Sequence, residues 1–153
     1  MLNNIKKKIS NYLLIIMDLK HSYDIGILIL RVFPGIAMFL NHGMNKISAG
    51  TAKWERLGNA LTDLIGFESL KIFFGFMASY AESLGALFII VGLLTRFSSF
   101  LLFFTMIVAS LKHYFEGEFS ELAFVYGCIC FALIISGPGK YSVDNILKKK
   151  IFN

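Results

Sequence analysis

Long apolar stretches separated by short polar links constrain this chain more than any other feature. A helix that crosses a bilayer needs about 20 mostly apolar residues, or about 17 at the short end. Four stretches approach or reach this length, and the last is the shortest: Asp24–Lys46, Leu70–Leu94, Phe97–Tyr114 and Glu121–Ser136. The pattern predicts an all-α fold, an integral membrane four-helix bundle in which successive helices are antiparallel.

The composition agrees with lipid as the main environment. Hydrophobic residues make up 56% of the 153 residues and charged residues 16%, whereas soluble domains carry about 25% charged residues. The net charge of +5 sits at the chain ends and in short links, with no basic stripe of interleaved aromatics, so we expect no nucleic-acid partner. Cys128 and Cys130 are two residues apart and would point to different faces of a helix, which predicts neither a disulfide nor a shared metal.

The distribution of lysine and arginine predicts the organisation of the chain. Residues 1–23 form a basic N-terminal segment, 24–144 the membrane domain, and 145–153 a basic C-terminal tail. The N-terminal segment has no small-residue cleavage site, so we interpret it as an amphipathic helix on the membrane surface, with a disordered tail as the alternative. Because positive residues favour the cytoplasmic side, both termini are expected there, in a bacterial inner membrane.

The link between the first two spans has its own helical pattern. Trp54, Leu57 and Leu61 recur at helical spacing, followed by Leu64 and Ile65. We expect a short amphipathic helix at the outer interface, with Trp54 at the depth of the lipid headgroups. Such a helix either covers a site beneath it, with Trp54 as part of a lid, or simply anchors the protein.

Two charges fall inside the predicted spans. Arg31 lies about 10 Å, and Glu82 about 18 Å, from the cytoplasmic end of its span at about 1.5 Å per residue. Charged residues within a span usually face the bundle and find partners. We therefore expect Arg31 and Glu82 to form a buried pair, directly or through one neighbour, and snorkelling by Arg31 alone is the alternative.

Several polar residues are expected at one level near the outer rim. His42 and Lys46 end the first span, His113 ends the third, and Glu121 begins the fourth. A rim in contact with water would explain any one of them, but the set suggests a ligand-binding site with His42 facing inward. Metal binding by His42, His113 and Glu121 lacks a local ligand motif, so no metal site is predicted.

The order of these short motifs resembles the DoxX family of small four-helix membrane proteins. The resemblance covers Ile27 to Asp144. It rests on the early Arg31, on the HG-x-x-K pattern at His42 to Lys46, and on AE-x-x-G at Ala81 to Gly85. It also includes GLLTR at Gly92 to Arg96, His113, and GPGKYSVD at Gly137 to Asp144.

The resemblance implies a membrane subunit linked to redox chemistry. Family members include subunits of thiosulfate oxidation with quinone as acceptor, and others that gather partner enzymes at the membrane in oxidative-stress responses. The sequence has no flavin, haem or iron–sulfur signature. The expected electron carrier is thus a quinone in the lipid or the cofactor of a partner redox enzyme. Catalytic residues are not identifiable, and whether the chain is itself an enzyme is an open question.

Three functions are compatible with this sequence. The first is a redox-linked subunit that binds quinone or a small anion, with proton exchange at His42 and His113 because imidazole titrates near neutrality. The second is a non-catalytic scaffold that docks partner enzymes. The third is a small transporter, although no internal repeat is evident and four spans make only a narrow pore unless the protein forms a homo-oligomer.

Overall fold

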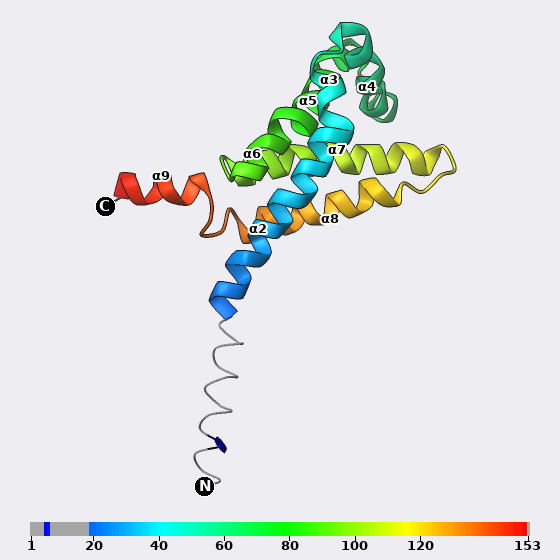
Figure 1. Ribbon diagram of the computed structural model, residues 1–153. Helices are drawn as coiled ribbons and strands as arrows, with labels where there is room; N and C mark the ends of the chain where they lie inside the picture. The colour runs from blue at the N-terminus through cyan, green and yellow to red at the C-terminus, as the bar shows by residue number, and fades with distance from the viewer. Residues whose placement is uncertain (1–4, 7–18, 153) are drawn as a thin grey trace.

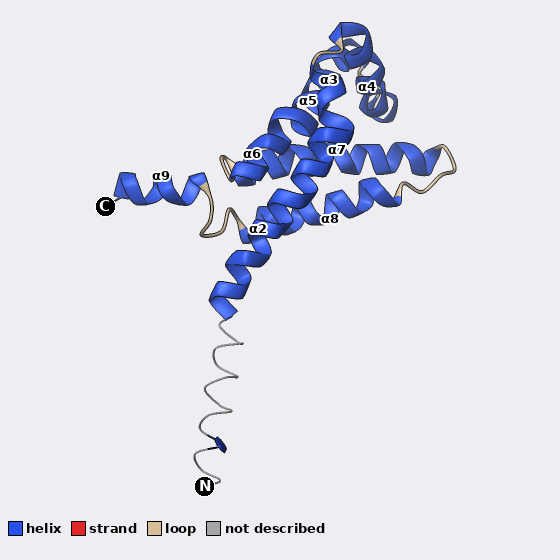
Figure 2. Cartoon of the chain, in the orientation of Figure 1, coloured by secondary structure: helices blue, strands red, loops and turns tan. Residues whose placement is uncertain are grey.

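The computed structural model describes residues 5–6 and 19–152, and all regular structure among them is helical (Figures 1 and 2). Most of the surface helix expected in residues 1–23 lies outside the described residues. The helices follow one another in this order: α2 (Leu19–Met38), the π-helical turn η1 (Phe39–Gly43), α3 (Met44–Ile47), α4 (Gly50–Ile65), the short 3-10 turn η2 (Glu68–Leu70), α5 (Lys71–Tyr80), the π-helical turn η3 (Ala81–Gly85), α6 (Ala86–Val91), α7 (Thr95–Phe115), α8 (Glu121–Ser136) and α9 (Val143–Phe152).

Three of the four predicted spans are present at nearly the expected positions. The helices that are long and apolar enough to cross a membrane are His21–Lys46, Glu68–Val91 and Thr95–Phe115. The fourth predicted span is the apolar helix α8, which has 16 residues. At about 1.5 Å per residue, α8 is shorter than the roughly 30 Å of bilayer hydrocarbon. Over residues 5–6 and 19–152 the fold is therefore all-α, with three candidate spans and one shorter apolar helix.

The surface of these helices carries many large apolar side chains. Phe33 is 68% exposed on α2, Phe73 is 56% exposed on α5, and Phe100 is 54% exposed on α7. A water-soluble protein rarely exposes so many large apolar side chains. The exposed aromatic surface of each candidate span is therefore expected to contact acyl chains.

Figure 1 shows α7 and α8 running side by side as a hairpin, with α2 crossing near them and α4 lying beside α5. The contact between α4 and α5 depends on glycine. A Cβ on Gly58 would lie 1.7 Å from the carbonyl oxygen of Lys71, and one on Gly75 would lie 1.6 Å from that of Trp54. The two backbones touch at both points, so no larger residue fits. The amphipathic helix predicted before the second span is confirmed as α4.

Arg31 ties α2 to two other parts of the fold. Its side chain is 1% exposed, and its guanidinium donates only to main-chain carbonyl groups among the hydrogen bonds of the described residues. The acceptors are the carbonyl oxygens of Ile89 at 3.1 Å, Ile90 at 3.3 Å, Tyr141 at 2.8 Å and Pro138. Five fixed N–H donors make arginine able to hold several carbonyls at once. Arg31 therefore joins α2, the end of α6 and the loop at 137–142.

Asp144 holds the start of α7. Its carboxylate accepts hydrogen bonds from Leu94 N at 2.8 Å, from Thr95 N at 2.9 Å and from Thr95 Oγ1 at 2.9 Å. Leu94 has a φ of 47°, which turns its amide and the next one toward this carboxylate. On the other side of the loop, Asp24 Oδ1 accepts from Lys140 N at 3.0 Å. The GPGKYSVD segment thus joins three helices at one end of the fold.

Candidate functional site

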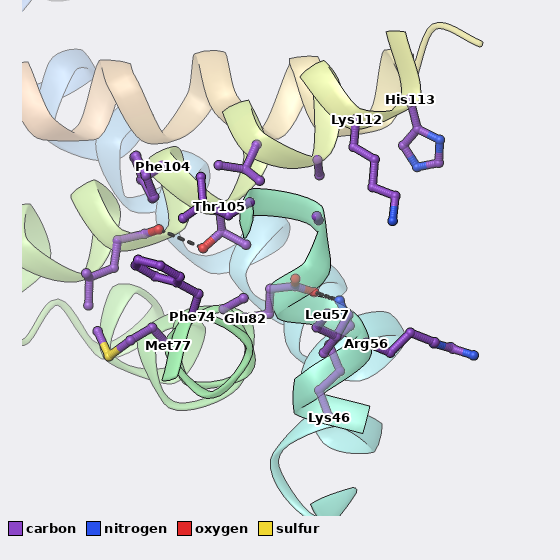
Figure 3. Close-up of a pocket in the computed structure, with 16 residues that line it drawn as sticks. Lys46, Arg56, Leu57, Phe74, Met77, Glu82, Phe104, Thr105, Lys112 and His113 are labelled. Carbon is purple, nitrogen blue, oxygen red and sulfur yellow. Dashed lines mark hydrogen bonds and ion pairs between the residues drawn. The ribbon is translucent and has the colours of Figure 1, made fainter. Parts of the chain in front are cut away.

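A cavity of about 410 Å³ lies between α4, α5 and α7. In Figure 1 the α7–α8 hairpin extends to one side, while α3, α4 and α5 extend in another direction. The cavity, shown in Figure 3, is lined by residues of α3 and α4 (Lys46, Arg56, Leu57, Ala60, Leu61), of α5 and η3 (Phe74, Met77, Ala78, Glu82), and of α7 (Leu101, Phe104, Thr105, Val108, Ala109, Lys112, His113).

An ion pair between Lys46 and Glu82 lies on the wall of this cavity. Lys46 Nζ is 2.5 Å from Glu82 Oε2, and the side chains are 19% and 5% exposed. Lysine carries three N–H donors and a carboxylate has several acceptor positions, so the pair retains capacity for a ligand. A buried charge is stable only with a partner, which makes each of these residues dependent on the other.

Two π-helical turns bring the pair together. Lys46 follows η1, Glu82 lies in η3, and these two turns are packed against each other. A Cβ on Gly43 would lie 2.3 Å from the carbonyl oxygen of Glu82, so the backbones are in direct contact there. Single π-helical turns inside α-helices occur frequently at functional sites. Here the local geometry points a lysine and a glutamate at one another.

Most of the remaining wall is apolar. Phe74, Met77, Leu101 and Phe104 line it, while Thr105 Oγ1 donates to the carbonyl oxygen of Leu101 in its own helix at 2.9 Å. An apolar wall with a few polar groups is typical of small-molecule sites, whose volumes run from roughly 300 to 1,000 Å³. The cavity therefore has the size and the lining of a site for a small ligand with an apolar body.

Basic groups line one end of the cavity. Figure 3 shows Lys112 and His113 at the end of α7 and Arg56 extending from α4. Lys112 Nζ and His113 Nδ1 each lie 3.8 Å from a carboxylate oxygen of Glu116, and these side chains are substantially exposed. These groups can attract an acidic ligand.

The predicted site residues divide into two groups. Lys46 and His113 line the cavity together, as does Glu82. His42 is half-buried on η1 and Glu121 is exposed at the start of α8, and neither lines the cavity.

Trp54 is not part of the lining either. It donates from Nε1 to the carbonyl oxygen of Lys46 at 3.1 Å and packs edge-on against Phe76. The lining contributed by α4 comes from Arg56, Leu57, Ala60 and Leu61.

Arg31 and Glu82 are both buried, but each bonds to a different partner from the one expected. Arg31 donates to carbonyl groups, and Glu82 pairs with Lys46. We expected them to pair because, along two straight helices at about 1.5 Å per residue, Arg31 lies only about 8 Å from the depth of Glu82 in the membrane. The direct contact between η1 and η3 brings the end of the first span to Glu82 instead.

Sequence reasoning did not single out the apolar lining of the cavity. The lining includes the apolar side chains of Phe74, Met77 and Phe104. Apolar side chains also face lipid, so residue type alone does not distinguish a lining residue from a lipid-facing one. A weak signal exists on α7, where the lining residues Leu101, Thr105, Val108 and Lys112 follow one another at intervals of four, three and four residues. No group of three or more metal-ligating side chains occurs within the part of the chain that the structure describes.

Apolar helices long enough to cross a bilayer, with a polar pair in a cavity between them, define a multi-pass membrane protein. The family model for DoxX matches residues 26–114, which is more than half of the chain, and the protein belongs to the DoxX family. The matched range includes Arg31, Lys46, Glu82 and His113, and confirms the resemblance that the motifs suggested. No curated protein and no solved structure matches the chain.

Proposed function

We propose that this protein is a redox-linked subunit of the bacterial cytoplasmic membrane that binds a quinone-type carrier in the cavity between α4, α5 and α7. The observation that carries the proposal is the Lys46–Glu82 pair, a largely buried ion pair on a mostly apolar wall. A quinone has a flat apolar ring and two carbonyl oxygens, so it requires this combination of apolar contact and polar anchoring.

The pair offers groups for both redox states of such a ring. Lys46 Nζ has N–H donors beyond the one directed at Glu82, and a quinone carbonyl oxygen accepts from them. The carboxylate of Glu82 accepts from the hydroxyl of the reduced ring. Phe74 and Phe104 supply apolar and aromatic contact with the ring faces.

Proton exchange is assigned to the open end of the cavity. A bound quinone accepts two electrons and two protons to become a hydroquinone, and the electrons come from a partner enzyme's cofactor. His113 lines the cavity and is 47% exposed, so its imidazole can pass protons between water and the site. This assignment retains His113 from the sequence prediction and leaves His42 out.

The proposal includes α8 as the fourth span of an antiparallel bundle, with both termini on the cytoplasmic side. The α7–α8 hairpin is closely packed, and α8 exposes Phe124, Phe131 and Ile135. A short span is accommodated by local thinning of the bilayer. The lysines at 148–150 favour the cytoplasmic side for the C-terminal end.

Quinone binding tests the proposal, and Trp54 provides the probe. It is the single tryptophan of the chain, and its indole donates to the carbonyl of Lys46 beside the cavity. A short-chain quinone titrated into purified protein is expected to quench Trp54 fluorescence and to reach saturation.

Ala109→Phe, which fills the cavity, should weaken binding at least about tenfold, or by about 1.4 kcal/mol. Ala132→Phe is the matched control, because Ala132 is exposed on α8 and does not line the cavity. Non-saturating quenching that is equal in all three proteins would refute the proposal.

A further inference from the structure

Helix α9 is fixed at its first turn and free beyond it. Asp144 is held by the start of α7, Asp144 N donates to the carbonyl oxygen of Gly92 at 2.9 Å, and Asn145 Nδ2 donates to that of Lys140 at 2.9 Å. Figure 1 shows the rest of α9 extending away from the other helices, and none of the extensive helix–helix contacts in the described part of the chain involves it.

The free part of α9 is both basic and apolar. Val143, Leu147 and Ile151 recur every four residues, with Ile146 beside them, so these side chains share one side of the helix. Ile146 is 64% exposed and Ile151 is 72% exposed. The lysines at 148–150 are also exposed. An exposed apolar side next to several lysines is the pattern of a helix that lies in a membrane interface.

We propose that α9 is a membrane-surface helix that binds the headgroups of anionic lipids. Its 10 residues extend about 15 Å, too short to cross a bilayer. The acidic residue within it, Asp144, is occupied by hydrogen bonds from Leu94 and Thr95, so the lysines dominate the charge of its free part. Anionic headgroups attract such a cluster of lysines.

The position of α9 supports a lipid partner. Its first turn is bonded to the 92–95 turn, where Leu94 is 55% exposed, and Phe97 one turn further along α7 is 56% exposed. Phe97 belongs to the candidate span Thr95–Phe115 and Leu94 directly precedes it, so α9 begins beside the end of a candidate span. The long stem of Lys150, which lies near the apolar side, can extend along the interface and keep its ammonium among the headgroups.

Hydrogen exchange of the full chain in lipid nanodiscs tests this assignment. One set of discs contains only phosphatidylcholine, and the other also contains phosphatidylglycerol. The backbone amides of residues 147–152 are expected to exchange at least about fivefold more slowly in the discs with the anionic lipid. Equal exchange in the two discs would overturn the proposal.

Two variants separate charge from helix content. The triple variant K148Q/K149Q/K150Q is expected to lose the difference between the discs, while K148R/K149R/K150R keeps it because the charges remain. Retention of the difference by the glutamine variant would overturn the lipid assignment. Protection that appears instead with increasing protein concentration, in both kinds of disc, would identify a second copy of the chain as the occupant and would also overturn it.

Discussion

Lys46 Nζ lies 2.5 Å from Glu82 Oε2, and this ion pair joins the end of the first candidate span to the middle of the second. Removing either partner leaves a charge in a mostly apolar setting. We predict that Lys46→Met costs more than Glu82→Gln, because the carboxylate that the first leaves unpaired is 5% exposed, whereas the ammonium that the second leaves unpaired is 19% exposed and nearer to water. The cost of Lys46→Met should be about 3 kcal/mol in the free energy of unfolding.

Thermal unfolding in detergent measures this difference. The double variant K46M/E82Q should be more stable than K46M alone, because it leaves no unpaired charge. The charge swap K46E/E82K should recover part of the stability as well. If the double variant lost the sum of both single effects, the two residues would not be acting as a pair.

Arg31 is predicted to require the guanidinium group, and not merely a positive charge. An ammonium group at this position cannot reach carbonyl oxygens on both α6 and the 137–142 loop. Arg31→Lys should therefore destabilise the protein by about 2 kcal/mol or more. Arg96→Lys is the control, because Arg96 is exposed and has one long bond, 3.4 Å, to the carbonyl oxygen of Ile135. Melting temperatures that fall equally in the two variants would contradict the role given to Arg31.

Asp144 is predicted to act as a cap on α7. Asp144→Ala removes the acceptor for the amides of Leu94 and Thr95, which should cost about 1 to 2 kcal/mol of stability. Asp144→Asn keeps one acceptor oxygen and should lie between the wild type and the alanine variant. Chemical denaturation of the three proteins gives the order. Asp63→Asn, an exposed position on α4, should leave stability unchanged.

The contact between α4 and α5 predicts opposite effects for two glycine substitutions. Gly75→Ala places a Cβ 1.6 Å from the carbonyl oxygen of Trp54, so α4 must move away from α5. We expect a loss of about 1 to 3 kcal/mol, as for other overpacked sites. Gly26→Ala on α2 meets no atom within 4 Å and should be neutral or stabilising by up to about 1 kcal/mol.

Unfolding of the two variants, followed by the fluorescence of Trp54, checks this prediction. The emission of Trp54 should change in the folded state of Gly75→Ala, since the main chain of Trp54 forms the displaced contact and its indole packs against Phe76, next to Gly75. No change in either stability or emission would show that the helices tolerate a side chain at this point.

Hydropathy was sufficient to locate the helices that form the membrane domain. The predicted second span, 70–94, corresponds to the helix Glu68–Val91, and the third, 97–114, to Thr95–Phe115. The alternation of apolar runs and short links carries this information because a bilayer imposes one minimum length on every span. The same pattern also predicts a fourth span at Glu121–Ser136, but the helix there, α8, has 16 residues and is shorter than that length.

The partners of the buried charges could not be predicted from the sequence. Arg31 bonds to the main chain at Pro138 and Tyr141, and carbonyl groups are present at every residue, so no residue type marks them. The pairing of Glu82 with Lys46 depends on the packing of η1 against η3, which periodicity does not show. Of the predicted rim residues, Lys46 and His113 line the cavity because α7 and the end of the first span flank it, whereas α8 does not.

The location of bound quinone tests the central proposal most directly. A short-chain quinone carrying a photoreactive azide would be added to the protein in lipid nanodiscs, and the labelled peptides would be mapped by mass spectrometry. We predict labelling of cavity-lining segments of α4, α5 and α7, around Leu57, Met77 and Leu101, and loss of that label when unmodified quinone is in excess. Labelling spread over the lipid-facing surface of α2 and α8, with no competition by unmodified quinone, would contradict it.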